Sequence, residues 1–135
     1  MRRLWCTILG LWLLVGTATA AIIDTSLATT GNVVTAQTAT GVSANILRIG
    51  RGKYRTLVVM MTNTGGAGTS TAQLEINCNG PTTTWALVAN SSTVMAAGAS
   101  AALNTVYPAC DYRINVTACT TCSVNVDYFL GPEIQ

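Results

Sequence analysis

The most restrictive feature of the sequence is the segment YRINVTACTTCSVNVDYF, where apolar and polar residues alternate on both sides of a short connection. The apolar members of the pattern are Tyr112, Ile114, Val116, Val124, Val126 and Tyr128. A period of two predicts two β-strands, each with one face in a core and one face in solvent. Cys119, Thr120 and Thr121 lie between them and predict a three-residue connection.

If these two strands form a hairpin, their register must place apolar side chains opposite apolar side chains. The predicted inner pairs are Val116–Val124, Ile114–Val126 and Tyr112–Tyr128, and the outer pairs are Arg113–Asp127 and Asn115–Asn125. This register also places opposite charges across from each other, which favours it slightly.

The rest of the chain shows the same preference for strands. It has no stretch with helical apolar periodicity, and β-branched residues recur between Gly, Asn and Thr. The predicted strands cover Asn32–Thr38, Ala44–Ile49, Tyr54–Thr62, Ala72–Cys78, Thr84–Ala89, Thr93–Ala96, Ala101–Val106, Asp111–Ala118 and Ser123–Leu130. Eight or nine short strands with frequent turns predict an all-β, antiparallel sandwich of the jelly-roll or immunoglobulin-like type. The glycine-rich segment TNTGGAGTST predicts a mobile hairpin turn.

The N-terminus has the pattern of a cleaved signal peptide. Arg2 and Arg3 precede an apolar run of about 12 residues, which is too short to span a membrane, and Ala18-Thr19-Ala20 forms a small-residue cleavage site. Residues 1–20 are therefore predicted to be removed. This leaves an N-terminal arm or edge strand at 21–40 and a β-sandwich domain at 41–135, secreted or on the cell surface and not inserted in the membrane.

Four cysteines follow the predicted cleavage site, at Cys78, Cys110, Cys119 and Cys122. In an oxidising compartment an even set predicts two disulfides, for which three connectivities exist. The spacing favours Cys119 with Cys122 across a turn and Cys78 with Cys110 between distant strands. Zinc is the rival interpretation of the CTTC motif, but the chain has no histidine and no second such pair, so no metal site is predicted.

Charge argues against several classes of function. Charged residues make up 9% of the chain, and removal of Arg2 and Arg3 lowers the seven basic residues to five, against five acidic ones. A neutral domain has no field that would draw it to nucleic acid, and low charge favours self-association. Without histidine the usual catalytic triads lack their base. Among the five carboxylates, Asp127 is assigned to an ion pair, Asp111 begins a strand, and Asp24 and Glu133 lie in the termini, so no catalytic pair is expected. We therefore expect neither enzymatic activity nor a cofactor.

Four of the remaining basic residues lie in the segment RIGRGKYR, at Arg48, Arg51, Lys53 and Arg55. Their clustering predicts either a contact for an anionic polymer or a solvated turn whose charges protect a strand edge from pairing. Tyr54, Trp85 and Tyr107 have rings that suit stacking on sugars or anchoring a core.

Two predicted strands, Leu57–Met61 and Trp85–Ala89, are apolar on both faces. A strand of a two-layer sandwich normally has one wet face, so either a loop of the same chain or a second subunit must cover the other face. The residues predicted to mediate self-association are Leu57, Val58, Val59, Met60, Met61, Ile22 and Ile23.

From Tyr54 onward the order of features, with LEINCNGPTTTWALV followed by YPACDYRINVTACTTCSVNVDYF, resembles small β-sandwich proteins among phage virion accessory and fibre components. The positions that carry this resemblance are Asn79, Gly80, Trp85, Tyr112 and Arg113. The predicted signal peptide, the disulfides and the low-charge composition are also similar to those of secreted pilin-like filament subunits. Both resemblances imply a structural or receptor-binding role outside the cell.

The leading hypothesis is therefore a secreted structural subunit that self-assembles into a homo-oligomer or filament by strand-edge or strand-exchange contacts. Residues 21–40 are the expected donated arm, because a lone Thr/Ala-rich strand needs another sheet to hold it. The alternative is a recognition module, extracellular or in a virion, that binds carbohydrate or a surface receptor through the basic turn and the hairpin tips.

Overall fold

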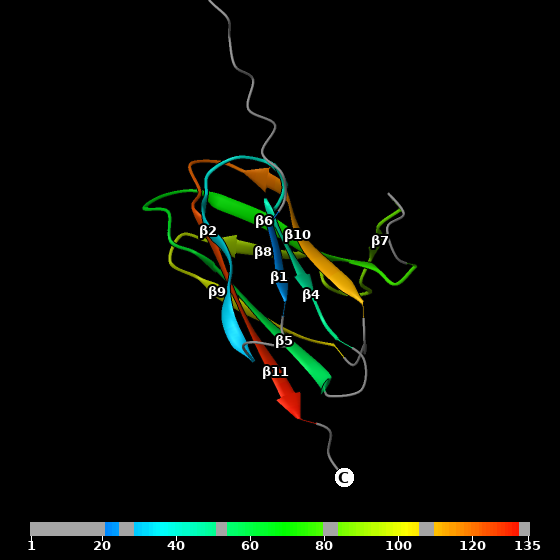
Figure 1. The fold of residues 1–135 in the computed structure, drawn as a ribbon. Coiled ribbons are helices and arrows are strands. Elements are labelled where there is room, and N and C mark those ends of the chain that lie inside the picture. The colour runs from blue at the N-terminus through cyan, green and yellow to red at the C-terminus, as the bar shows by residue number, and fades with distance from the viewer. Residues whose placement is uncertain (1–20, 25–28, 51–53, 80–83, 106–109, 133–135) are drawn as a thin grey trace, which may run out of the picture.

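The computed structural model describes residues 21–24, 29–50, 54–79, 84–105 and 110–132, with the side chains of Tyr54, Arg55 and Pro132 left out of the description. In these ranges the chain forms strands and turns without a helix, and the strands build two packed sheets (Figure 1). This confirms the all-β sandwich. The predicted signal peptide lies outside the described residues. No helix in the described part of the chain has the length and hydropathy to cross a membrane.

One sheet has four strands in the order β2 (Thr30–Gln37), β11 (Val124–Pro132), β5 (Tyr54–Asn63) and β9 (Ser100–Thr105). The other has seven, with a main path of β1 (Ala21–Asp24), β4 (Asn45–Arg48), β10 (Asp111–Cys119), β6 (Thr69–Asn77) and β7 (Ala86–Leu87). On this second sheet β3 (Gly41–Val42) also pairs with β10, and β8 (Thr93–Ala96) with β6. All nine predicted strands exist, β8 with its predicted ends and the other eight with shifted ends, and β1 and β3 are additional short strands.

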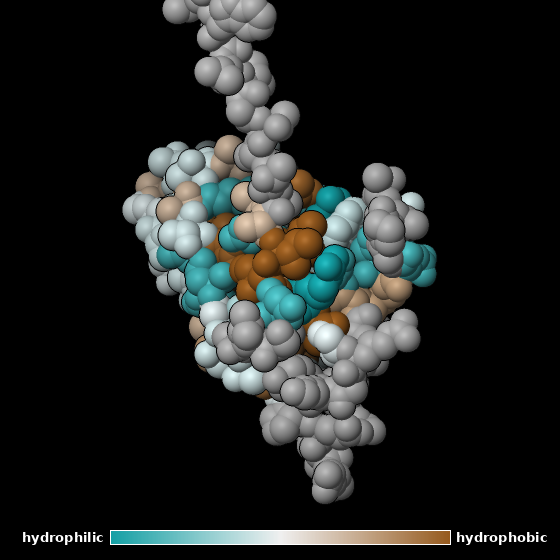
Figure 2. All heavy atoms as spheres, viewed as in Figure 1, coloured by the Kyte–Doolittle hydropathy of each residue, from teal (hydrophilic) through white to brown (hydrophobic). Residues whose placement is uncertain are grey.

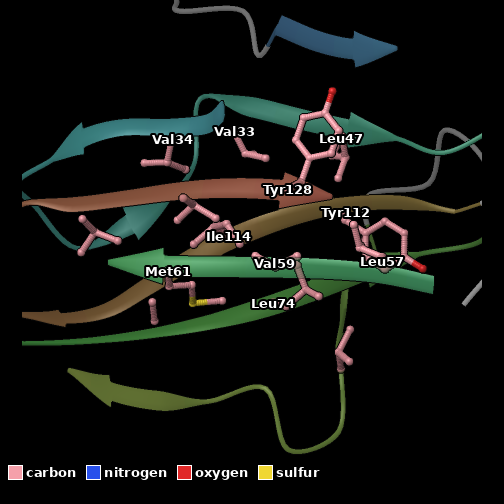
Figure 3. Close-up of a cluster of buried hydrophobic side chains, with 14 of the residues drawn as sticks. Val33, Val34, Leu47, Leu57, Val59, Met61, Leu74, Tyr112, Ile114 and Tyr128 are labelled. Carbon is pink, nitrogen blue, oxygen red and sulfur yellow. The ribbon is translucent and has the colours of Figure 1, made fainter. Parts of the chain in front are cut away.

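The core lies between the sheets and uses one face of each long strand (Figure 3). In β10 the side chains of Tyr112, Ile114 and Val116 are fully buried, and β11 contributes Val124, Val126 and Tyr128. Period-two alternation therefore predicted the inner face of both strands correctly.

The predicted hairpin is wrong, because β10 and β11 belong to different sheets. β10 pairs with β6, β4 and β3, whereas β11 pairs with β5 and β2. The Cys119–Cys122 connection carries the chain across the edge of the sandwich, so the two apolar faces meet through the core rather than side by side. Arg113 consequently lies opposite Glu75, and Asp127 accepts a hydrogen bond from Asn32 Nδ2 at 3.0 Å.

The sandwich is not wholly antiparallel, since β1 runs parallel to β4. Between these two strands the chain crosses to the other sheet as β2 and returns as β3, and parallel neighbours require such a crossover. Both strands of the predicted arm at 21–40 are paired within this chain, β1 with β4 and β2 with β11.

β2 is an edge strand with two irregularities. Its register with β11 shifts twice, Val33 and Val34 are both buried, and Ala36 has a φ of +51°. The Ala36 amide donates to Asn125 Oδ1 at 2.6 Å, which holds the second irregularity in place. Bulges of this kind twist an edge away from further strand pairing.

Both predicted disulfides are present, Cys78–Cys110 and Cys119–Cys122. The glycine-rich segment predicted as a mobile turn packs against the second of them. Thr64 N donates to Ser123 O at 2.7 Å, and a Cβ placed on Gly68, whose φ is +93°, would overlap the carbonyl oxygen of Thr120. The 120–122 backbone leaves no room for a Cβ on Gly65 or Gly68. The segment joins β5 to β6, and these strands belong to different sheets, so the predicted hairpin is wrong.

Asn63 organises this end of the sandwich from a fully buried position. Its Oδ1 accepts hydrogen bonds from the amides of Gly65 and Ser123 at 3.1 and 3.2 Å, and its Nδ2 donates to the carbonyl of Met95 at 3.3 Å. The side chain thereby ties the turn after β5 to β8 and to the start of β11.

Candidate functional site

A connected group of polar side chains lies on the outer face of the seven-stranded sheet. We call it the polar platform, and its members are Gln73, Glu75, Trp85, Arg113 and Asn115. The position of four of them follows from alternation: Ala72 and Leu74 in β6, and Tyr112, Ile114 and Val116 in β10, are buried, so the residues between them face outward. The β6–β10 register then places Arg113 beside Glu75 and Asn115 beside Gln73.

Glu75 is the centre of the platform. Arg113 Nε donates to Glu75 Oε2 at 2.6 Å, and Asn115 Nδ2 and Gln73 Nε2 donate to Glu75 Oε1 at 2.8 and 3.2 Å. The side chains of Arg113 and Glu75 are 24% and 10% exposed, so this ion pair is partly shielded from water.

The pKa of Glu75 reflects two opposed effects. Burial of the carboxylate is the largest and would raise the pKa, but the hydrogen bonds from Asn115, Arg113 and Gln73 together outweigh it. The pKa of Glu75 is therefore held below its ordinary value of 4.5, and the group is ionised at neutral pH.

Trp85 adds an aromatic surface to this network. Its ring lies 4.4 Å from the guanidinium carbon of Arg113, measured to the ring centroid, and the residue is half-buried. A cation over an indole face is attracted by the ring quadrupole. Trp85 is thus held on the outer face of the sheet and does not anchor the core.

Apolar side chains border the platform. Leu87 pairs with Glu75 from β7 and is 53% exposed, while Val42 pairs with Asn115 from β3 and is 48% exposed. Ile22 of β1, 52% exposed, pairs with the half-buried Ile46 of β4. Figure 2 shows brown surface at the place that β1 and β4 occupy in Figure 1, with teal surface beside it toward β10.

The basic cluster predicted from RIGRGKYR is described only in part. Arg48 forms a two-pronged ion pair with Asp111, with Nε–Oδ1 and Nη2–Oδ2 distances of 2.8 Å. The hydrogen bond and the charge of Asp111 raise the pKa of Arg48, and the two opposite charges neutralise each other. Arg51 and Lys53 lie outside the described residues, as does Tyr107, and the side chain of Arg55 is not described.

The residues predicted to mediate self-association are divided between the core and the surface. Leu57, Val59 and Met61 are buried in the core, where their side chains are not available to a second copy. Val58 is half-buried, Ile23 packs against the core, and Met60 is 39% exposed. Met60 shares the outer face of the four-stranded sheet with Phe129, which is 43% exposed and lies opposite Val58.

Sequence reasoning identified Trp85 and Arg113 but placed Arg113 against the wrong acid, and it missed Gln73, Glu75 and Asn115 as a group. The alternation of AQLEIN does signal that Gln73 and Glu75 face outward. The missing information was the partner strand, because the platform exists only where β6 and β10 lie side by side.

Comparison with known proteins gives little to set beside this geometry. No protein-family model and no curated protein matches the chain. Among solved structures, the N-terminal cellulose-binding domain of Cellulomonas fimi β-1,4-glucanase C is similar at 16% identity and a TM-score of 0.37, over 78% of each chain. A TM-score this low supports no inference about function, and the resemblance to phage and pilin-like proteins stays a prediction.

Proposed function

We propose that the chain is an exported, non-enzymatic recognition module that binds a neutral polysaccharide through the polar platform. The observation that supports this most directly is the Trp85–Arg113–Glu75 arrangement, in which an indole ring, a guanidinium and a carboxylate are fixed together on the outer face of a sheet. The two disulfides are consistent with an oxidising, extracytoplasmic location, and the predicted signal peptide supplies the route of export.

The chemistry of the platform suits a sugar chain. A sugar ring has apolar C–H surfaces, which pack on aromatic and aliphatic side chains, and a rim of hydroxyl groups that donate and accept hydrogen bonds. Trp85 and Leu87 offer the first kind of contact, and the amide and guanidinium groups around Glu75 offer the second. Because hydrogen bonds within the platform already restrain these side chains, binding costs little further side-chain entropy.

The balance of charge favours a neutral ligand. The charges of Arg113 and Glu75 are paired within the platform, and those of Arg48 and Asp111 are paired beside it. An anionic polymer would have to compete with these carboxylates for the two arginines, and binding to such a polymer falls steeply with added salt. Hydroxyl-rich neutral chains face neither obstacle.

The substitution Trp85→Ala tests this proposal. We expect the apparent affinity for a bound neutral polysaccharide to fall at least about tenfold, because aromatic anchors at a binding surface commonly contribute more than about 1.4 kcal/mol. The measurement is affinity electrophoresis and pull-down against cellulose, xylan, mannan and β-1,3-glucan, with alginate and polygalacturonate as anionic comparisons.

Phe129→Ala is the matched control, since it removes an exposed aromatic ring from the outer face of the other sheet. Equal retention by Trp85→Ala and the unmodified protein would refute the proposal. Binding confined to the anionic polymers and lost in salt would instead indicate the basic cluster.

Self-association is the second candidate function, and one observation favours it. Val58, Met60 and Phe129 form an apolar area on the outer face of the four-stranded sheet. Assembly through this face, or by exchange of β1 between copies, would give discrete large species or filaments. Size-exclusion chromatography and negative-stain microscopy of the purified protein distinguish such species from a monomer.

A further inference from the structure

An open cleft of about 460 Å³ lies on one flank of the sandwich, between β2 of the four-stranded sheet and the β3–β4 side of the other. Val33 and Val34 contribute buried apolar side chains, and the polar lining includes Gln37, Thr38 and Asn45. This volume lies within the range of small-molecule sites.

The walls of the cleft are fixed by side-chain hydrogen bonds. Asn45 Nδ2 donates to Val33 O at 2.9 Å and thereby joins the two sheets. Gln37 Nε2 donates to the carbonyls of Ala39 and Gly41 at 3.1 and 3.0 Å, which shapes the loop between β2 and β3. Cys119 Sγ lies 3.2 Å from the Thr38 carbonyl oxygen, so the second disulfide supports the same loop.

The chemistry of the lining favours a neutral, hydroxyl-bearing occupant. The lining side chains are valine, alanine, threonine, asparagine and glutamine, and none is charged. The exposed side chain of Val42 offers an apolar surface to the face of a ring, while hydroxyl and amide groups offer donors and acceptors to its rim. A charged ligand would find no opposite charge among these residues.

Val42 links the cleft to the polar platform, because it borders the platform and also lines the cleft. Gln73, Asn115 and Val42 occupy one row across β6, β10 and β3, and Val42 also lines the cleft. Neighbouring strands lie about 4.8 Å apart, so this row spans about 10 Å. A chain that crosses the platform along the row therefore reaches the mouth of the cleft.

We propose that the cleft binds further residues of the same neutral polysaccharide, so that the binding site extends from the platform into the cleft. This inference rests on the proposed function, because the platform must hold the preceding part of the chain. It predicts that affinity rises with chain length until the ligand reaches from the platform into the cleft.

The test uses Ala44→Trp, which places a large side chain at an exposed residue that lines the cleft. The probes are the linear tri- and hexasaccharides of β-1,4-glucose, β-1,4-xylose and β-1,4-mannose, titrated by calorimetry. For the unmodified protein we expect the hexasaccharide of the preferred sugar to bind more tightly than its trisaccharide. Ala44→Trp should weaken hexasaccharide binding at least about tenfold and leave trisaccharide binding unchanged.

Ala102→Trp is the matched control, because it adds the same side chain to an exposed position on β9 of the other sheet. If circular dichroism shows that Ala44→Trp does not fold, Thr40→Arg at the exposed lip of the cleft replaces it. Unchanged hexasaccharide binding in the folded cleft variant, together with a loss in Trp85→Ala, would overturn this inference and leave the proposed function intact. Binding that is insensitive to Trp85→Ala, or absent for every sugar, would refute the proposed function itself.

Discussion

The contact between Gly68 and the Thr120 backbone gives the sharpest prediction about stability. Gly68 has a φ of +93°, and a Cβ there would overlap the carbonyl oxygen of Thr120. Alanine at this position has to adopt a backbone conformation that costs L-residues about 1–2 kcal/mol. It must also displace backbone atoms, and forced overpacking costs about 1–3 kcal/mol.

The two costs together predict that Gly68→Ala lowers the free energy of unfolding by about 2–5 kcal/mol. A domain of this size has about 5–15 kcal/mol in total, so the loss is a large fraction. At about 4 °C per kcal/mol, the midpoint of thermal unfolding should fall by about 8–20 °C. The assay is thermal and urea unfolding of the oxidised protein, followed by circular dichroism.

Gly66→Ala is the matched control two residues away. A Cβ on Gly66 meets nothing within 4 Å, and its backbone is not in the left-handed region. Alanine there should be neutral or raise stability by less than about 1 kcal/mol. Equal midpoints for the two variants would show that the 64–68 turn does not pack on the 120–122 connection, and the reasoning would be refuted.

Two further predictions concern the platform. Because the pKa of Glu75 is lowered in the folded state, its stabilising contribution is present above the ordinary pKa of 4.5 and is lost as the pH falls through the lowered value. In urea titrations between pH 3 and 7, the free energy of unfolding should therefore decline less at low pH for Glu75→Gln than for the unmodified protein. Parallel declines would contradict this assignment. Double-mutant cycles should give a coupling energy of about 1 kcal/mol or more between Arg113 and Glu75, and none between Arg113 and Asp127. The opposite result would favour the Arg113–Asp127 pair of the predicted hairpin.

The alternation of apolar and polar residues accounts for most of what the sequence predicted correctly about the fold. In strands such as β10 and β11 the buried and exposed faces follow directly from period two, so the core residues were identified without knowledge of the partners. The partners themselves were not, because a three-residue connection between two such strands fits a hairpin and a crossing of the sandwich equally well. The apolar residues that were matched as hairpin partners therefore belong to two different sheets, whose inner faces meet in one core.

The candidate site was predictable to a smaller extent for a related reason. Trp85 and Arg113 stand out in the sequence as residue types. Their place in the site depends on Glu75, which lies about 40 residues earlier in the chain than Arg113. No local pattern joins such residues. The disulfides were predicted well because the number and spacing of cysteines limit the connectivity before any strand is paired.

The Cys78–Cys110 bond joins the end of β6 to the start of β10, the two strands that carry most of the platform. Everything from β7 to β9 lies inside the covalent loop that it closes. A protease that nicked this loop would produce two fragments that remain linked and keep β6 beside β10. The framework of the platform would therefore survive a single cut in this loop.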